Sequence, residues 1–142
     1  MADYALSVKQ PWAALLVHGL KTIEVRRWPT ARRGLVYIHA ARVPDERPEG
    51  WARLPAHLQE TAALRGGLIG AARLVDCKPY RTGDRFAADQ HLHLNEPGWY
   101  EGPVLFGFTF AEPQVQPFRR CPGWFRFFEV PPAPPPKLVT PP

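Results

Sequence analysis

The amino-acid sequence predicts a single α+β domain, built as a mixed β-barrel of five or six strands with two or three short helices. A chain of 142 residues suits one hydrophobic core. Hydrophobic residues make up 45% of it and aromatic residues 12%, which is enough for a packed interior. Short segments of β-forming residues recur between Gly and Pro turns, and small β domains commonly avoid exposed sheet edges by closing into a barrel.

An extended segment and a helix come first. Residues 5–8 alternate in the manner of a strand, and Pro11 then stops the strand, because proline lacks the ladder donor and suits the first turn of a helix. Apolar residues at near-helical spacing predict a short helix over residues 11–18 that is apolar on one side. Gly19 stands where a left-handed helix cap is expected.

Two strands are expected next, over residues 21–28 and 34–40. In the first strand, Glu24 and Arg26 share one face, whereas Lys21 starts on the opposite face. The second strand is dense in β-forming residues and reads as buried.

A polar loop at residues 44–49 leads into a second helix, which we expect over residues 51–64. Gly66 and Gly67 end this helix. The alternation over residues 68–77 then predicts another strand.

The last third of the domain is predicted to hold two aromatic strands, over residues 104–110 and 123–130, that pair with each other. Before them we expect a turn at residues 79–84 and an irregular segment with one helical turn at residues 86–100.

Proline content divides the chain into a folded domain, residues 1–130, and a tail, residues 131–142. Seven of the last twelve residues are proline, a composition that predicts an extended, disordered tail and builds no core. Pro-x-x-Pro spacing beside Lys137 leaves open that the tail docks in an aromatic groove of a partner protein.

The positive charge is concentrated near the N-terminus. The chain has a net charge of +5, and its first 34 residues hold six Lys and Arg against two acidic residues. Such asymmetry favours a polyanionic partner, nucleic acid above all.

The cysteine content, the length of the apolar stretches and the first residues of the sequence indicate the cellular location of the protein. Two cysteines, Cys77 and Cys121, are too few and too far apart for a disulfide framework or a Cys-based zinc site. No apolar stretch approaches membrane-spanning length, and the first residues carry no export signal. We therefore expect a cytoplasmic protein that makes no use of a membrane.

Two neighbouring stretches carry a family resemblance. Residues 6–13 read LSVKQPWA, and residues 19–26, GLKTIEVR, contain a Gly-x-Lys-x-x-Glu-x-Arg motif after the first helix. They resemble the ASCH (activating signal cointegrator homology) family, with less specific similarities over roughly residues 5–130. The resemblance implies a barrel related to the PUA domain (pseudouridine synthase and archaeosine transglycosylase), with a cleft beside the first helix where RNA or modified nucleosides bind.

Eight residues are candidates for ligand binding at that cleft: Lys9, Gln10, Trp12, Lys21, Glu24, Arg26, Trp28 and His39. Lys21 and Arg26 have the chemistry to hold phosphate, and Glu24 to accept from the amino group of a base. Trp28 stands among arginines and is the best candidate for base stacking. The alternative for Glu24 and Arg26 is a purely structural ion pair.

The alternative function is a small hydrolase, because the family resembled also contains ribonucleases and an amidohydrolase of acylated cytidine. In the amidohydrolase branch a threonine nucleophile stands at the position of Glu24, and a carboxylate lacks the hydroxyl that this route needs. Thr22 has a hydroxyl but no clear paired base. His39 and Lys21 would nominally supply the base and acid of a ribonuclease, although a lone strand histidine is more often a satisfied core residue.

We therefore predict a non-catalytic RNA- or nucleotide-binding domain. Single-stranded RNA is the favoured ligand, with DNA or a free modified nucleoside left open, as is the oligomeric state. His91 and His93 form a His-x-His pair but lack a third ligand at a suitable spacing, so we expect no metal and no cofactor.

Overall fold

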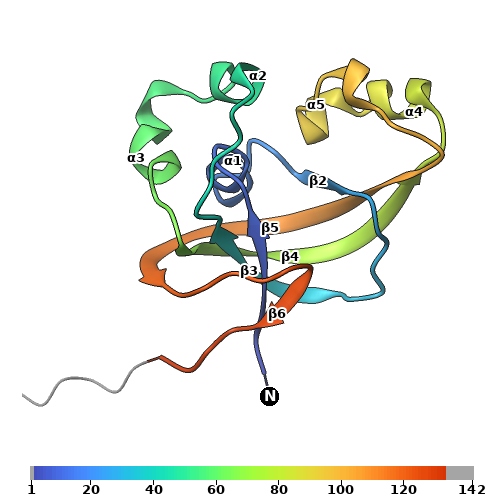
Figure 1. The fold of residues 1–142 in the computed structure, drawn as a ribbon. Helices are drawn as coiled ribbons and strands as arrows, with labels where there is room; N and C mark the ends of the chain where they lie inside the picture. The colour runs from blue at the N-terminus through green and yellow to red at the C-terminus, as the bar shows by residue number, and fades with distance from the viewer. Residues whose placement is uncertain (1, 134–142) are drawn as a thin grey trace, which may run out of the picture.

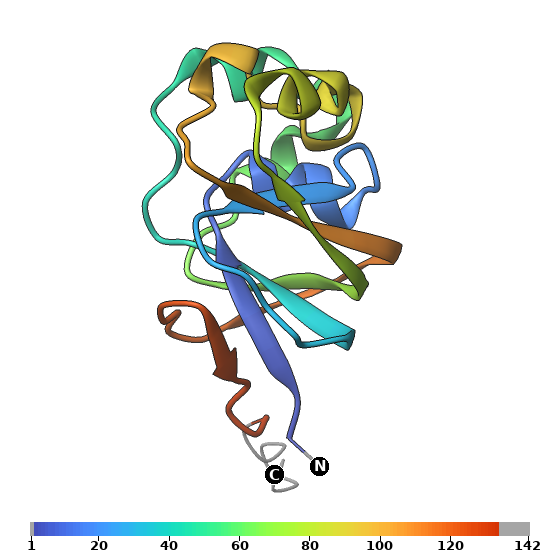
Figure 2. The same ribbon diagram turned by 90° about the vertical axis from the view of Figure 1, so that its right-hand side faces the viewer.

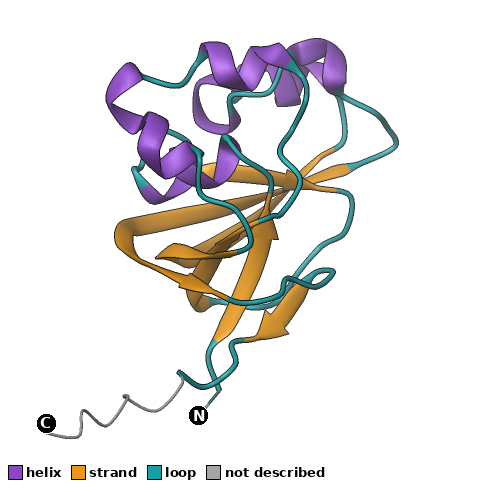
Figure 3. Cartoon of the chain, turned by 60° about the vertical axis from the view of Figure 1, so that its left-hand side comes forward, coloured by secondary structure: helices purple, strands orange, loops and turns teal. Residues whose placement is uncertain are grey.

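In the computed structural model, which describes residues 2–133, the chain forms a strongly curved six-stranded sheet with helices gathered at one end (Figures 1 and 3). The sheet order is β2-β5-β4-β3-β1-β6; β1 and β3 run parallel, and the other neighbours are antiparallel. The strands are β1 (Tyr4–Val8), β2 (Ile23–Arg26), β3 (Gly34–Ala40), β4 (Gly67–Tyr80), β5 (Leu105–Arg120) and β6 (Phe127–Glu129). The predicted α+β fold with five or six strands is confirmed.

The sheet curls until its two edge strands meet through aromatic side chains. Trp28, just after β2, packs edge-on against Phe127 of β6 with ring centroids 5.7 Å apart. Phe108 of β5 lies parallel to Phe127 at 6.0 Å. Because β2 and β6 stand at opposite ends of the hydrogen-bonded order, these contacts complete a partly closed barrel (Figure 2).

The helices are short, and they cap one end of the barrel (Figure 3). The longest among residues 2–133, α1 and α4, have six residues each. The α-helices are α1 (Trp12–Val17), α2 (Pro48–Ala52), α3 (Gln59–Ala62), α4 (Gly83–Ala88) and α5 (Gln90–His93), with 3-10 turns at Ala56–Leu58 and Pro97–Trp99. The helical part is thus divided into more pieces than the two or three predicted.

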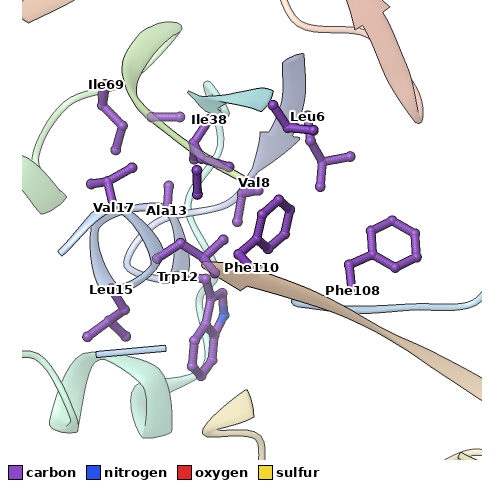
Figure 4. Packing of buried hydrophobic residues seen from close by; sticks show 14 of the residues in the cluster. Leu6, Val8, Trp12, Ala13, Leu15, Val17, Ile38, Ile69, Phe108 and Phe110 are labelled. Atoms are coloured by element: carbon purple, nitrogen blue, oxygen red, sulfur yellow. The ribbon is translucent and has the colours of Figure 1, made fainter. Parts of the chain in front are cut away.

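Helix α1 is the centre of the core rather than a one-sided surface helix. All six of its residues are buried, which contradicts the one-sided pattern expected. The reason is that α1 packs on β3, β4 and β5 and is covered by α3 from the other side. Figure 4 shows Val17 of α1 beside Ile69 of β4, while Leu15 lies on the opposite side of the helix.

The end of α1 confirms the predicted glycine cap. Gly19 has φ +77° and donates to the Leu16 carbonyl at 3.1 Å, while Leu20 donates to the Leu15 carbonyl at 3.0 Å. This pair of bonds is a Schellman motif, which needs a left-handed residue that glycine adopts without strain. The motif reverses the chain and brings Lys21 back over the end of α1.

The helix predicted over residues 51–64 is broken into short turns. Pro55 has an extended backbone with ψ 147°, and a proline ring disfavours the helical conformation of the residue before it. Helix α2 instead begins at Pro48, inside the expected loop at residues 44–49. Gly66, with φ +68°, ends the helical region just before β4, as predicted.

The strands β4 and β5 extend well beyond their predicted bounds. Pro79 lies within β4 and not in a turn, and the next element is α4, whose N-cap Thr82 accepts a hydrogen bond from the backbone of Arg85 at 3.2 Å. Residues 86–100, expected to be irregular, hold the end of α4, all of α5 and a 3-10 turn. Three register shifts between β4 and β5 interrupt the alternation from which strand length is read.

The predicted pairing of the two aromatic strands is wrong. β5 lies between β2 and β4, so both of its edges are occupied, and β6 pairs with β1 instead. The second aromatic strand is also shorter than residues 123–130, because Trp124 and Phe125 precede β6 in a loop. Strand composition carries no information about which distant strand offers a free edge.

Residues 134–142, which include most of the predicted tail, lie outside the described part of the chain. The boundary between a domain at 1–130 and a tail at 131–142 stays a prediction. Within residues 2–133, none of the helices combines the length and the apolar character needed to traverse a bilayer.

The close approach of β4 to α1 leads to a test of this packing. A Cβ built on Gly70 would lie 2.7 Å from a methyl group of Val17 and would also meet the Gln114 carbonyl. Gly70→Ala should therefore lower the free energy of unfolding by about 2 kcal/mol in urea titrations, as overpacked cores do. Gly98→Ala is the control, because nothing lies within 4 Å of its added Cβ. Equal stability of the two variants would contradict this packing.

Candidate functional site

A cleft of about 1020 Å³ opens beside α1, between the ends of β1 and β2, the loop after β3 and the segment before β6. Its lining is rich in two kinds of side chain. The basic ones are Lys9, Arg26, Arg27, Arg42, Arg47 and Arg126; the large aromatic ones are Trp12, Trp28, Trp124 and Phe125. We call this hollow the basic cleft.

The two carboxylates that line the basic cleft, Glu24 and Asp45, are both engaged in ion pairs. Oε2 of Glu24 accepts from Nη2 of Arg26 at 2.9 Å and from its Nε at 3.1 Å. Oδ2 of Asp45 accepts from Nη2 of Arg47 at 2.7 Å. Arg27 pairs with Glu101, which lies outside this lining. Among residues 2–133 the other lining cations, Lys9, Arg42 and Arg126, form no ion pair with these carboxylates, so the field of the cleft is positive.

Lys21 lies beneath the floor of the cleft. Its side chain is fully buried, and its Nζ lies 2.5 Å from the His93 carbonyl, to which it donates, and 3.4 Å from Oε1 of Glu24. Burial lowers the pKa of Lys21 to about 8, against the opposing pull of Glu24. The turn after Gly19 thus brings Lys21 to Glu24, although the sequence pattern placed the two on opposite faces of the strand, and Lys21 does not line the cleft.

Arg26 connects β2 to β1, two strands that do not pair with each other in the sheet. Besides its two bonds to Glu24, its Nη2 donates to the backbone carbonyl of Ser7 in β1 at 2.8 Å. β1 and β2 are not neighbours in the sheet, so the guanidinium spans the barrel mouth between them. Its side chain keeps 21% of its surface exposed, which leaves it accessible from the cleft.

Ser7 and His39 form a hydrogen-bonded pair on the adjacent strands β1 and β3. Nε2 of His39 lies 2.7 Å from the Cys121 carbonyl, which can only accept, so this nitrogen carries a proton. In the neutral ring, Nδ1 is then the acceptor for the Ser7 hydroxyl at 3.0 Å. Burial lowers the pKa of His39, which favours this neutral form.

The other wall is built around Asp45. Its Oδ2 accepts from the Trp12 indole at 2.8 Å, and the guanidinium carbon of Arg47 stands 3.7 Å above the Trp99 ring. Burial alone would raise the pKa of Asp45, but the hydrogen bonds from Arg47 and Trp12 outweigh it and lower the pKa to about 2. The loop is therefore fixed by a charged group that stays ionised at neutral pH.

Trp28 is half-buried. Its ring packs edge-on against Phe108 at 5.0 Å, and the Arg126 guanidinium lies 5.1 Å from its centre. Gln10, in contrast, is completely buried and lies outside the cleft lining. Its amide donates to the carbonyls of Thr61 and Leu64, so it joins α1 to the α3 region.

The structure thus brings six of the eight predicted residues to one cleft: Lys9, Trp12, Glu24, Arg26, Trp28 and His39. Gln10 and Lys21 stand behind it. Other lining residues were not predicted from the sequence, among them Ser7, Asp45, Arg47, Trp124, Phe125 and Arg126. The sequence signals for most of them are weak. Asp45 and Arg47 are an acidic and a basic residue in a loop, and Trp124 and Phe125 look like the start of the strand predicted over residues 123–130.

In the His-x-His pair, His93 has a structural role. Nε2 of His93 donates to the Phe86 carbonyl at 2.7 Å, and its Nδ1 accepts from the Asn95 backbone at 2.9 Å. Both ring nitrogens are therefore engaged. Across residues 2–133, three or more His, Cys, Asp or Glu side chains never gather as a metal site would need.

The chain matches the ASCH domain family over residues 6–113. It is 37% identical over 86 residues to human Activating signal cointegrator 1 and 36% identical over 87 residues to the mouse protein. Each match covers 52% of this chain but 14% of the relative, so the similarity concerns one part of those longer proteins.

Solved structures share the fold. The crystal structure of ASCH from Zymomonas mobilis aligns with a TM-score of 0.65 and 14% identity, over 90% of this chain and 87% of that one. A mutant of the same protein aligns with a TM-score of 0.59 and 17% identity, over 83% and 75%. These likenesses confirm the fold that the resemblance to the ASCH family implied. Since the family match spans most of the described residues, the chain belongs to the ASCH domain family.

Proposed function

We propose that this protein binds single-stranded RNA, or a nucleotide-like part of it, in the basic cleft. The observation that carries the proposal is the charge of the lining, with six Lys and Arg side chains and two carboxylates that are both paired. Phosphate groups are the ligands that such a lining attracts most strongly. The resemblance to the ASCH family implies the same class of ligand.

The geometry suggests different roles for exposed and half-buried cations. Arg42 and Arg126 are exposed at the cleft and are suited to the phosphate backbone, which positions a strand without reading it. Arg26 and Glu24 lie deeper. Within residues 2–133, Glu24 and the Ser7 carbonyl engage Nε and Nη2 of Arg26, so its Nη1 is the donor left for the edge of a base. Lys21 acts through Glu24 by fixing its other oxygen from below.

One observation favours a hydrolase as the second candidate. Ser7 donates to a neutral His39 whose other nitrogen is oriented by a carbonyl, the arrangement of a nucleophile with its base. The route through His39 and Lys21 is less favoured, because the Lys21 amine is buried below the cleft. Ligand binding requires neither a nucleophile nor a general base, so binding remains the leading proposal.

Salt dependence tests the electrostatic part of the proposal. Affinity for a short single-stranded RNA should fall steeply with salt, with a log–log slope of about −0.7 for each phosphate neutralised. Three to five contacts would give a slope between about −2 and −3.5. Fluorescence anisotropy titrations at several salt concentrations measure this slope. A flat response would remove the basic cleft as the binding surface.

Arg26→Ala tests whether the deeper groups contact the ligand. It should weaken binding about tenfold or more, because a charge-assisted hydrogen bond is lost. Glu24→Gln should change ligand preference and also lower the melting temperature, because it leaves the buried Lys21 ammonium without its carboxylate. Arg73→Ala is the matched control, since Arg73 also pairs with a carboxylate but lies outside the cleft lining. Melting temperatures are measured on the same samples. Unchanged affinity in the folded Arg26 and Glu24 variants would leave this pair with a structural role only.

Product analysis separates binding from turnover. The purified protein is incubated with short RNAs and with acylated nucleosides, and the mixture is analysed for products and for retained ligand. We expect RNA to be retained and recovered intact. Products that form with the native chain and vanish in Ser7→Ala would instead establish the hydrolase, because that variant removes the hydroxyl facing His39.

A further inference from the structure

Two adjacent aromatic side chains stand almost free at the rim of the basic cleft. Trp124 is 68% exposed and Phe125 96%, the highest values among the large hydrophobic side chains of residues 2–133. Both line the cleft. Single exposed apolar residues are common on proteins, but neighbouring aromatic rings at a concave charged site indicate an interaction surface.

The segment that carries these rings is anchored at both ends. Before them, the Cys121 carbonyl accepts from Nε2 of His39 at 2.7 Å. After them, Phe127 enters β6 and packs against Trp28. A Cβ on Gly123 would lie 2.7 Å from the His39 ring, so the absence of a side chain lets the backbone rest on that ring. The rings are therefore held outward on a fixed support.

The charges around the rings select the kind of partner. Arg126 follows Phe125 directly, and Arg42 lies exposed on the same cleft. A partner for this surface must combine negative charge with flat apolar faces. Unpaired nucleic-acid bases on a phosphate backbone have both properties, whereas in a duplex the base faces are covered by stacking on one another.

We propose that Trp124 and Phe125 form a stacking platform for unpaired bases, and hence that the site selects single strands over duplexes. This inference rests on the proposed function and adds to it the residues that recognise the base faces. Stacking on a ring is tolerant of sequence, because every base has a π-face, so RNA and DNA single strands both use the platform. Trp28, which the sequence made the first candidate for stacking, contacts Arg126 and Phe127, the two residues that follow the platform.

The test compares a single-stranded oligonucleotide with an abasic chain of the same length, which keeps the phosphates and lacks the bases. Single strands of about 12 nucleotides match the site sizes of such proteins. The native protein should bind the RNA strand, and the DNA strand likewise, on the order of tenfold or more tighter than the abasic chain. It should also prefer either single strand over the corresponding duplex.

The variant Trp124→Ala/Phe125→Ala should lose this preference for bases, binding oligonucleotide and abasic chain to within about twofold of each other. Its affinity for the abasic chain and its salt dependence should stay as in the native protein. Leu35→Ala/Val115→Ala is the matched control, because these side chains are 55% and 50% exposed but lie outside the cleft lining. Trp124→Phe keeps a ring and should retain most of the affinity.

The outcomes separate this inference from the proposal beneath it. Failure of the native protein to bind either chain overturns both. Tight binding that the double alanine variant leaves unchanged overturns the platform alone, and would direct attention to a protein partner for these rings. Equal losses on oligonucleotide and abasic chain would also overturn it, because the rings would then shape the cleft instead of contacting bases.

Discussion

A fully buried lysine constrains the mouth of this barrel. The Lys21 side chain is buried from water, so its ammonium charge needs polar partners inside the protein. Glu24 and the His93 carbonyl are these partners. Removing one partner of a buried pair commonly costs about 3–5 kcal/mol, because the remaining charge stays uncompensated. The position of β2 relative to the end of α1 and to α5 therefore depends on this cluster.

The same polar contacts continue across the barrel mouth. Glu24 accepts from Arg26, Arg26 donates to the Ser7 carbonyl in β1, and the Ser7 hydroxyl meets His39 in β3. His39 in turn holds the Cys121 carbonyl at the start of the aromatic segment. Structure and proposed function are thus linked, since the groups that hold the strands together also form the floor of the basic cleft and fix its aromatic rim.

Much of the fold and part of the site could be predicted from local sequence. The Gly19 cap and the bounds of β3 follow from residue chemistry at short range. The site residues Asp45 and Arg47 could not be predicted in the same way. They lie in a loop without periodicity, and their importance comes from Trp12 and Trp99, distant residues that the fold places against them.

By itself, the sequence determined the α+β class, the family motif, and the concentration of positive charge in the first third of the chain. These depend on composition and on spacings of a few residues, where backbone geometry follows the local pattern. Only the tertiary structure decided that β6 pairs with β1, that Gln10 and Lys21 face inward, and that Trp124 and Phe125 stand exposed beside the cleft. The physical reason is that burial and strand pairing depend on contacts between segments that are distant in the sequence. An aromatic or charged residue has the same identity in the sequence whether or not such a contact covers it, so its exposure cannot be predicted locally.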